Sequence, residues 1–140
     1  MLFGIRFVEM ADKSFWFTLD NHFSEQEFEL KVRDKRGYVI CNEKNPIGVM
    51  RYNLFWDNTP FLTMIYLDKP YHGRGFGRLA MAFWEEEMRR LGYKMVMTSM
   101  QTDEEAQHFY RKLGYIEKGS LLFDNTPYEQ PMEILMMKVL

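Results

Sequence analysis

A glycine-rich loop holds the residues of this chain that are most readily linked to ligand chemistry. Residues 72–77, with the sequence HGRGFG, place a glycine at every second position just before a long amphipathic helical pattern. Glycine lets a backbone approach a ligand closely and adopt conformations barred to other residues. The first N–H groups of a helix have no acceptor inside it, and the helix dipole favours negative charge there. The loop therefore predicts a phosphate site made of backbone amides, although a tight strand-to-helix turn explains the glycines equally well.

Two nucleotide-binding patterns fit this loop poorly. A P-loop needs Gly-Lys-Ser or Gly-Lys-Thr, whereas Gly77 is followed by Arg78 and Leu79. A dinucleotide-binding Rossmann unit usually begins a series of alternating strands and helices, whereas this loop follows a run of strands. The ligand must be identified from the rest of the chain.

The elements around the loop predict a strand–helix–strand unit over residues 61–100. Phe61–Leu67 reads as a strand, and the helix after the loop carries apolar residues from Phe76 to Leu91 before Gly92 ends it. Lys94–Met100 reads as the next strand, which should run parallel to the first through a right-handed crossover.

The segments on either side complete one α/β (α+β) domain over residues 1–140. The patterns before the unit predict strands at Phe3–Glu9, Tyr38–Cys41 and Ile47–Phe55 and helices at Ala11–Phe23 and Glu25–Asp34. Those after it predict a helix from the capping box at Thr102 to Gly114, then strands at Tyr115–Phe123 and Met132–Val139. The short links between the early strands favour an antiparallel meander.

Composition and charge limit the classes of partner and site that we expect for this chain. The 140-residue chain has a net charge of −2 and a pI near 5.9, so electrostatics does not favour nucleic acid or an anionic membrane as a partner. Cys41 is alone, and the three histidines lack the spacing of zinc ligands, so we expect no disulfide and no metal. The sequence has no signal-peptide pattern and no apolar run near the ~20 residues of a membrane span, which favours the cytoplasm.

A second motif lies further along the chain and bears on the identity of the ligand of the loop. Residues 103–115 read Asp-x-x-Ala-x-x-Phe-Tyr-x-x-Leu-Gly-Tyr, and Tyr71–Gly77 reads YHGRGFG. Together these two motifs resemble motifs B and A of the GNAT family, the Gcn5-related N-acetyltransferases. His72 stands where motif A has Gln or Arg, and Asp103 stands where motif B often has Asn. The order of elements also resembles that family over nearly the whole chain.

The resemblance implies the GNAT acyl-CoA N-acyltransferase fold, a mixed and mainly antiparallel sheet flanked by helices on both faces. It implies acetyl-CoA as co-substrate, bound where the strand ending at Leu67 splays from the strand starting near Lys94. The pyrophosphate would lie on the loop amides, and the pantetheine arm would pair with the preceding strand. The cofactor-binding residues predicted in this way are Tyr66, Leu67, His72, Gly73, Arg74, Gly75, Phe76, Gly77 and Asp103.

The resemblance also implies a catalytic role for Tyr110, which stands at a position where many members protonate the leaving thiolate. A phenol with a pKa of about 10 stays protonated at neutral pH and can act as a general acid. A tyrosine that only packs in the core explains the same position. A primary amine would attack the thioester directly in a ternary complex, with a backbone N–H near Leu67 stabilising the oxyanion. Spacing does not single out a general base among its candidates, Glu9, Asp57, Asp68 and Glu133.

Other functions fit parts of the sequence. A non-catalytic acyl-CoA-binding sensor needs the loop but not Tyr110, and a nucleotide-binding protein would retain ATP or NAD instead of CoA. The acceptor amine, whether small molecule or peptide, is not encoded in a recognisable pocket motif. A homodimer is consistent with the resemblance, because homodimers are common in the family.

Overall fold

The computed structural model describes residues 2–140, which form a seven-stranded sheet with the strand order β1-β2-β3-β4-β5-β7-β6. The strands are β1 (Phe3–Phe7), β2 (Gly37–Asn42), β3 (Asn45–Phe55), β4 (Thr59–Leu67), β5 (Met95–Gln101), β6 (Ile116–Leu121) and β7 (Glu133–Val139). The helices are α1 (Lys13–Leu19), α2 (Glu25–Asp34), α3 (Phe76–Arg90) and α4 (Ala106–Lys112), with short 3₁₀ turns η1 (Met10–Asp12) and η2 (Lys69–Tyr71). Pairing is parallel between β4 and β5 and antiparallel for β1–β2, β2–β3, β5–β7 and β6–β7. The mixed, mainly antiparallel sheet of the sequence prediction is confirmed.

The chain divides into two compact units. The first contains the residues up to Asn53 together with Thr63–Glu86, and the second contains Leu54–Leu62 and Glu87–Leu140. The glycine loop therefore belongs to the first unit, and Tyr110 belongs to the second. Whether the chain unfolds as the single domain expected from its sequence stays a prediction.

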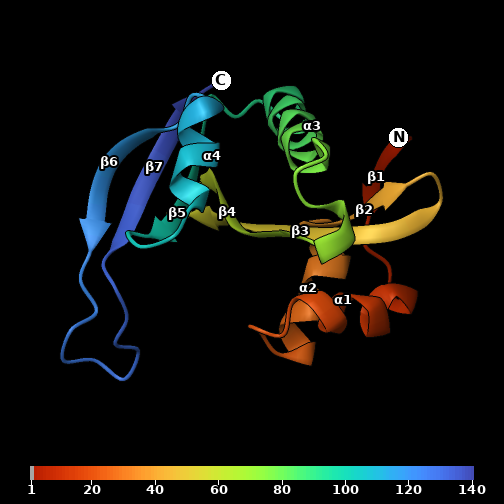
Figure 1. Ribbon diagram of the computed structural model, residues 1–140, viewed down its shortest axis with the longest axis horizontal. Helices are drawn as coiled ribbons and strands as arrows, with labels where there is room; N and C mark the ends of the chain where they lie inside the picture. Colours follow the sequence, from red (N-terminus) through yellow and green to blue (C-terminus); the bar gives the residue numbers. More distant parts are fainter. Residues whose placement is uncertain (1) are drawn as a thin grey trace. The chain divides into compact units, whose positions relative to one another are not determined.

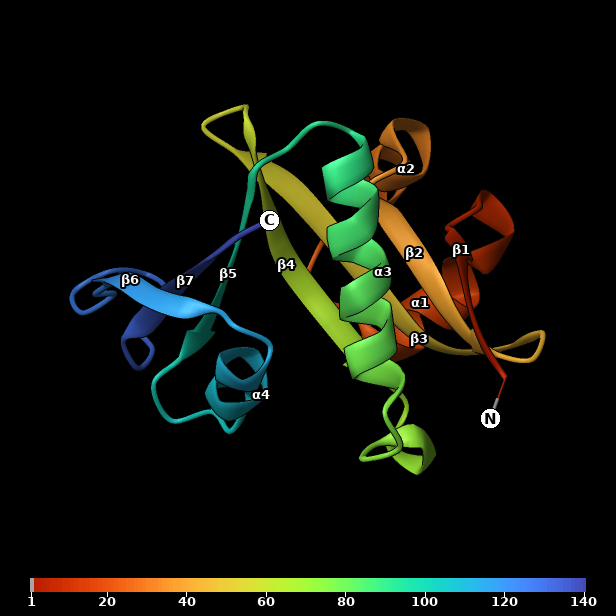
Figure 2. The same cartoon turned by 90° about the horizontal axis from the view of Figure 1, so that it is seen from above.

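Helices cover both faces of the sheet in the first unit. Figure 1 shows α1 and α2 on one side of β2 and β3 and α3 on the other, and Figure 2 shows the same order of layers from above. This explains why β2 is buried at five consecutive positions, since a strand covered on both faces has no solvent side.

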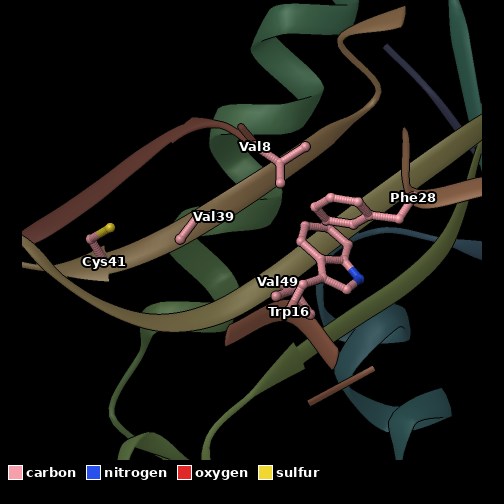
Figure 3. Close-up of a cluster of buried hydrophobic side chains, with 6 residues drawn as sticks. All are labelled: Val8, Trp16, Phe28, Val39, Cys41 and Val49. Atoms are coloured by element: carbon pink, nitrogen blue, oxygen red, sulfur yellow. The ribbon is translucent and has the colours of Figure 1, made fainter. Parts of the chain in front are cut away.

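The core between the sheet and the first two helices is aromatic. Trp16 and Phe28 are fully buried, and their ring centroids are 5.8 Å apart in an edge-on arrangement. Val39 and Val49 present the sheet surface against which they pack (Figure 3). On the opposite face Trp84 of α3 is fully buried with its ring edge-on to Tyr52 at 5.7 Å.

The helix predicted over Ala11–Phe23 is shorter in the structure, because α1 ends at Leu19. Asp20 takes an extended conformation, with φ −133°, and is fully buried. Its carboxylate accepts hydrogen bonds from Trp16 Nε1 at 3.1 Å and from Arg51 Nε at 2.7 Å. The bond to Arg51 ties Asp20 to β3 at the point where the helix ends. By contrast, Ser24 caps α2 as predicted and accepts from the Glu27 amide at 3.1 Å.

The second unit contains the parallel pair of the predicted strand–helix–strand unit. Phe61 of β4 lies opposite Met97 of β5, and Leu62 lies opposite Thr98. The helix predicted from Thr102 begins only at Ala106, because residues 102–105 form a turn in which the Glu104 amide bonds the Gln101 carbonyl at 3.1 Å.

Two features are absent from the described residues, 2–140. None of the helices there is long and apolar enough to cross a membrane. The same residues contain no group of three or more His, Cys, Asp or Glu side chains that could hold a metal ion.

Candidate functional site

The end of β4 is fixed by its close approach to β3. A Cβ placed on Gly48 would lie 2.5 Å from Leu67 Cδ2 and 2.9 Å from the Tyr66 carbonyl oxygen, distances that real Cβ atoms do not show. The Asp68 amide donates to the Ile47 carbonyl at 2.8 Å. Gly48 therefore permits the backbone of Tyr66 and Leu67, predicted to pair with a pantetheine arm, to lie where it does. The bond to Ile47 also occupies the Asp68 amide, which is therefore not free to bind a ligand.

A short 3₁₀ turn, η2, connects this strand end to the glycine loop. The Asp68 side chain accepts from the Lys69 amide at 2.9 Å, and the Tyr71 amide donates to the Asp68 carbonyl at 2.9 Å. The His72 amide donates to the Lys69 carbonyl at 3.1 Å. The His72 amide, which the sequence prediction offered to a phosphate, is therefore already bonded.

The glycines of the loop adopt conformations that other residues rarely take. Gly73 and Gly75 have φ of +71° and +89°, and a Cβ on either would meet no atom within 4 Å. Glycine is needed there for its backbone, and the space on that side is open. The Leu79 amide donates to the Gly75 carbonyl at 3.1 Å, and this is the first hydrogen bond of α3. The amides that precede Leu79 in the first turn, including that of Gly77, therefore have no acceptor within the helix. An open cradle of amides at a helix start suits an anion.

Aromatic and cationic side chains hold the loop in place. Phe76 is fully buried, and the Tyr71 ring lies edge-on to it at 5.9 Å. The Arg74 guanidinium lies 5.3 Å from the centre of the Tyr71 ring and 5.6 Å from that of Phe76. Phe76, predicted as a ligand contact, therefore anchors the loop with its side chain and can offer only its amide. Arg74 and Arg78 are exposed beside these amides.

His72 makes a contact that the sequence did not indicate. Its Nε2 donates a hydrogen bond to the Leu67 carbonyl, and the Tyr66 ring lies edge-on to the imidazole at 5.7 Å. Because a carbonyl oxygen can only accept, Nε2 must carry a proton. The carbonyl assigned to the pantetheine arm thus already has a donor from the protein.

Tyr110 is nearly enclosed within the second unit. It is 6 % exposed, with the Phe109 and Tyr115 rings at 5.2 and 5.6 Å. Burial raises its pKa to about 12, a hydrogen bond with the Thr98 side chain opposes the shift, and the negative charge of Glu104 adds to it. The phenol is therefore protonated throughout the physiological range.

Sequence reasoning missed Thr98 and Glu104, which both act on Tyr110. Thr98 was detectable as a polar residue within the apolar run of β5, where it is 1 % exposed. Burial raises the pKa of the Glu104 carboxyl, and the neighbouring charges of Glu133 and Asp103 raise it further. Asp103 itself is exposed and does not cap α4, whose N-cap position is Glu105.

The four carboxylates considered as general bases have different surroundings. Asp68 caps a turn, and Asp57 lies in a turn with φ +61°. Glu9 is the N-cap residue of η1. One carboxylate oxygen of Glu133 accepts a hydrogen bond from Ser99 Oγ at 2.7 Å, and the other accepts one from Gln130 Nε2 at 3.5 Å. None of these contacts singles out a base.

Comparison with known proteins identifies the family. The sequence model of the Acetyltransferase (GNAT) family matches residues 6–115, which is most of the chain. An uncharacterized Bacillus subtilis (strain 168) protein, YyaT, is 29% identical over 117 residues, which cover 80% of this chain and 77% of that protein.

Two solved structures share the fold. Ard1 from Thermoplasma volcanium is 16% identical with a TM-score of 0.84, covering 100% of this chain and 99% of that one. A GNAT family acetyltransferase from Elizabethkingia anophelis with acetyl-CoA bound is 16% identical with a TM-score of 0.79, covering 99% and 98%. With the GNAT sequence match over residues 6–115, these likenesses place the glycine loop and Tyr110 in a known fold, and the chain belongs to the GNAT acetyltransferase family.

Proposed function

We propose that this protein is an acetyl-CoA-dependent N-acetyltransferase that acetylates a primary amine. The observation that carries the proposal is the open cradle of amides at Gly73–Gly77, directly after β4, in a member of this family. Its chemistry suits a pyrophosphate, because the helix start supplies donors and Lys69, Arg74 and Arg78 supply positive charge within a few residues.

The first unit supplies the groups that would hold the cofactor. The amides of the loop and of the first turn of α3, including Gly75 and Gly77, would bind the phosphate oxygens. Backbone groups of Tyr66 and Leu67 would pair with the amides of the pantetheine arm, as an added strand pairs with a sheet edge. When bound, acetyl-CoA supplies an activated acetyl group as a thioester, so no covalent intermediate on the protein is required.

We assign Tyr110 the role of proton donor to the leaving thiolate. With a pKa of about 12 the phenol always carries its proton, but it is a weak acid beside an ordinary thiol at ~8.5. The difference of roughly 3.5 units corresponds to about 5 kcal/mol against complete transfer. Tyr110 can therefore assist only if the phenolate is stabilised or if the phenol donates a strong hydrogen bond.

One observation favours a second candidate, the non-catalytic acyl-CoA sensor. Tyr110 is buried and hydrogen-bonded inside its own unit, as a purely structural tyrosine would be. A sensor would retain the amide cradle and would not depend on this phenol.

Release of free thiol from acetyl-CoA in the presence of a panel of amines separates the two candidates. The panel should contain peptide N-termini, lysine, polyamines, aminoglycosides and small amines. An enzyme should release thiol with at least one of these, and Tyr110→Phe should lower kcat about 100-fold, within the range of general acid catalysis. Binding of acetyl-CoA without turnover of any amine, and without an effect of Tyr110→Phe, would instead establish the sensor. Native mass spectrometry of the purified protein tests the cofactor directly, because a nucleotide-binding protein would carry ATP or NAD.

A further inference from the structure

The paired strands β5 and β7 have one buried face and one half-open face. Thr98 lies opposite Met136, and Ser99 lies opposite Leu135. Thr98 and Met136 are 1% and 0% exposed, whereas Ser99 and Leu135 both keep part of their surface exposed. Such alternation is expected of a sheet that turns one face to a core and the other toward solvent. The half-open face is therefore accessible to a ligand.

Glu133, the first residue of β7, lies on this half-open face. It is opposite Gln101, the last residue of β5, on one side and opposite Leu121 of β6 on the other. Because β5 runs parallel to β4, Glu133 lies at the carboxyl end of the parallel pair. That end is where ligands bind in open sheets with parallel strands. Glu133, Gln101 and Leu121 all belong to the second unit.

The Glu133 carboxylate is held by neutral donors. One oxygen accepts from Ser99 Oγ at 2.7 Å, and the other accepts from Gln130 Nε2 at 3.5 Å. Within residues 2–140 no lysine, arginine or histidine forms an ion pair with it. A partly buried charge is normally paired with an opposite charge, and carboxylate oxygens that accept one bond can accept another. The arrangement suits a cation supplied by a ligand.

Apolar side chains lie beside Glu133 on the same face. Leu121, directly opposite it, is 48% exposed, and Leu135 is the next residue of β7 on this face. Met137 and Ile116 lie opposite each other further along, and Ile116 is 59% exposed. A cation bound at Glu133 would therefore place the group next to its charge on an apolar surface.

We propose that Glu133 binds the protonated amine of the acceptor substrate and that the leucines beside it favour an amine with an apolar substituent. The ammonium supplies the opposite charge that the carboxylate lacks, and Ser99 holds the carboxylate in position. A polyamine or an aminoglycoside would bring further polar groups onto the apolar surface and lose their hydration there. The inference rests on the proposed function and concerns binding, since loss of the proton before attack is a separate step.

The first test compares amines and variants by thiol release from acetyl-CoA. The parent protein should turn over phenethylamine with a kcat/KM at least tenfold above that for spermidine or kanamycin. Glu133→Gln keeps the shape and removes the charge, and should lower kcat/KM for phenethylamine about 10- to 100-fold through the KM for the amine. The KM for acetyl-CoA should not change. Glu117→Gln, a matched change on the other face of the sheet, should behave like the parent.

The second test addresses the apolar surface. Leu121→Ser should lower kcat/KM for phenethylamine about fivefold and leave that for methylamine unchanged, because only the larger amine has an apolar group to bury. Leu122→Ser changes the next residue, which is 71% exposed, and should affect neither amine. An equal effect of the two variants, or of Leu121→Ser on both amines, would refute the selection of apolar substituents.

The third test measures binding without turnover. Calorimetric titration of the parent with phenethylamine should show one site, which Glu133→Gln weakens by about the factor found for kcat/KM. Ser99→Ala keeps the charge but releases the carboxylate, and should weaken binding about three- to fivefold. It keeps the inference testable if thermal unfolding shows that Glu133→Gln does not fold.

These tests separate the inference from the proposed function. If the parent turns over no amine but binds phenethylamine through Glu133, the proposed function is wrong and the amine site stands. Unchanged affinity in Glu133→Gln or in Ser99→Ala would overturn the inference whatever the activity. An equal loss in Glu117→Gln, or a preference for spermidine or kanamycin, would also overturn it.

Discussion

Asp20 and Arg51 form a buried ion pair at the point where α1 ends. Their side chains are 0% and 7% exposed, and the Arg51 guanidinium also lies 4.2 Å from the centre of the Phe23 ring. A buried charge whose partner is removed remains without compensation, which makes such pairs sensitive to single substitutions. The pair thus fixes the path of the chain between α1 and α2.

We predict that Asp20→Ala destabilises the protein by about 3–5 kcal/mol, because it leaves the Arg51 charge buried and also removes the acceptor of Trp16 Nε1. The double variant Asp20→Ala with Arg51→Met should lose less than the sum of its single variants. Urea unfolding measures both effects. Additive losses would show that the two side chains do not act as a pair.

At the scale of elements, the start of α3 combines the requirements of folding and binding. The positive φ of Gly75 is a folding requirement, and the open space beside it would admit the phosphate that we propose binds there. Gly92, beyond the end of the same helix, has φ +94° and equally open space. The two glycines therefore have similar backbone conformations, but only Gly75 lies in the loop. Gly92 can thus serve as a matched control.

We predict that Gly75→Ala and Gly92→Ala each destabilise the protein by about 1–2 kcal/mol, the strain of a left-handed conformation on an alanine. Only Gly75→Ala should weaken coenzyme A binding, by about tenfold or more, since its methyl group enters the cradle. Thermal unfolding and calorimetric titration provide the two measurements. Equal effects of both variants on affinity would place the anion site elsewhere.

The sequence predicted the elements with strong local signals and missed those set by distant contacts. The glycine loop, α3 and the parallel strands follow from periodicity and turn chemistry. The end of α1 depends on the buried carboxylate of Asp20 and its bond to Arg51, residues far apart in the sequence. The bond from the Thr98 hydroxyl to the Leu62 carbonyl depends on strand register, and the bond of the His72 ring to Leu67 depends on the geometry of η2. Pattern reasoning has no access to either.

At the scale of the whole molecule, the buried phenol of Tyr110 makes the free energy of unfolding decrease at alkaline pH. Its pKa is raised from 10 to about 12, so the folded state favours the neutral form. The stabilisation is fully present below pH ~10 and is lost as the pH rises toward 12, because the unfolded chain then releases a proton that the folded chain retains.

We predict that the free energy of unfolding falls by up to about 3 kcal/mol between pH 10 and 12 on account of this residue, from two pKa units at ~1.36 kcal/mol each. In Tyr110→Phe this part of the decline should be absent, whereas Tyr128→Phe, a change at an exposed tyrosine, should keep it. Urea titrations over this range make the comparison. Parallel curves for all three proteins would contradict the prediction.

We also predict that the two units unfold together as one domain. Trp16 and Trp84 are buried in the first unit, whereas Trp56 is exposed in the second. In a Trp56→Phe variant the tryptophan fluorescence therefore reports on the first unit, while amide exchange along β5 and β7 reports on the second. Both probes should give the same midpoint in urea, as expected of a single domain of this size. Separate midpoints would show that the units are independent.

The bond from the His72 ring to the Leu67 carbonyl has a consequence for how the product leaves. When a ligand that pairs with a strand end is released, the backbone group that it bonded loses its hydrogen-bond partner. That loss raises the free-energy barrier to release of the ligand. If CoA pairs with this carbonyl as we propose, the His72 imidazole can replace it as the hydrogen-bond partner when the product leaves. We expect His72→Ala to slow CoA dissociation and so to tighten CoA binding, which would mean that the histidine at this position of motif A speeds product release.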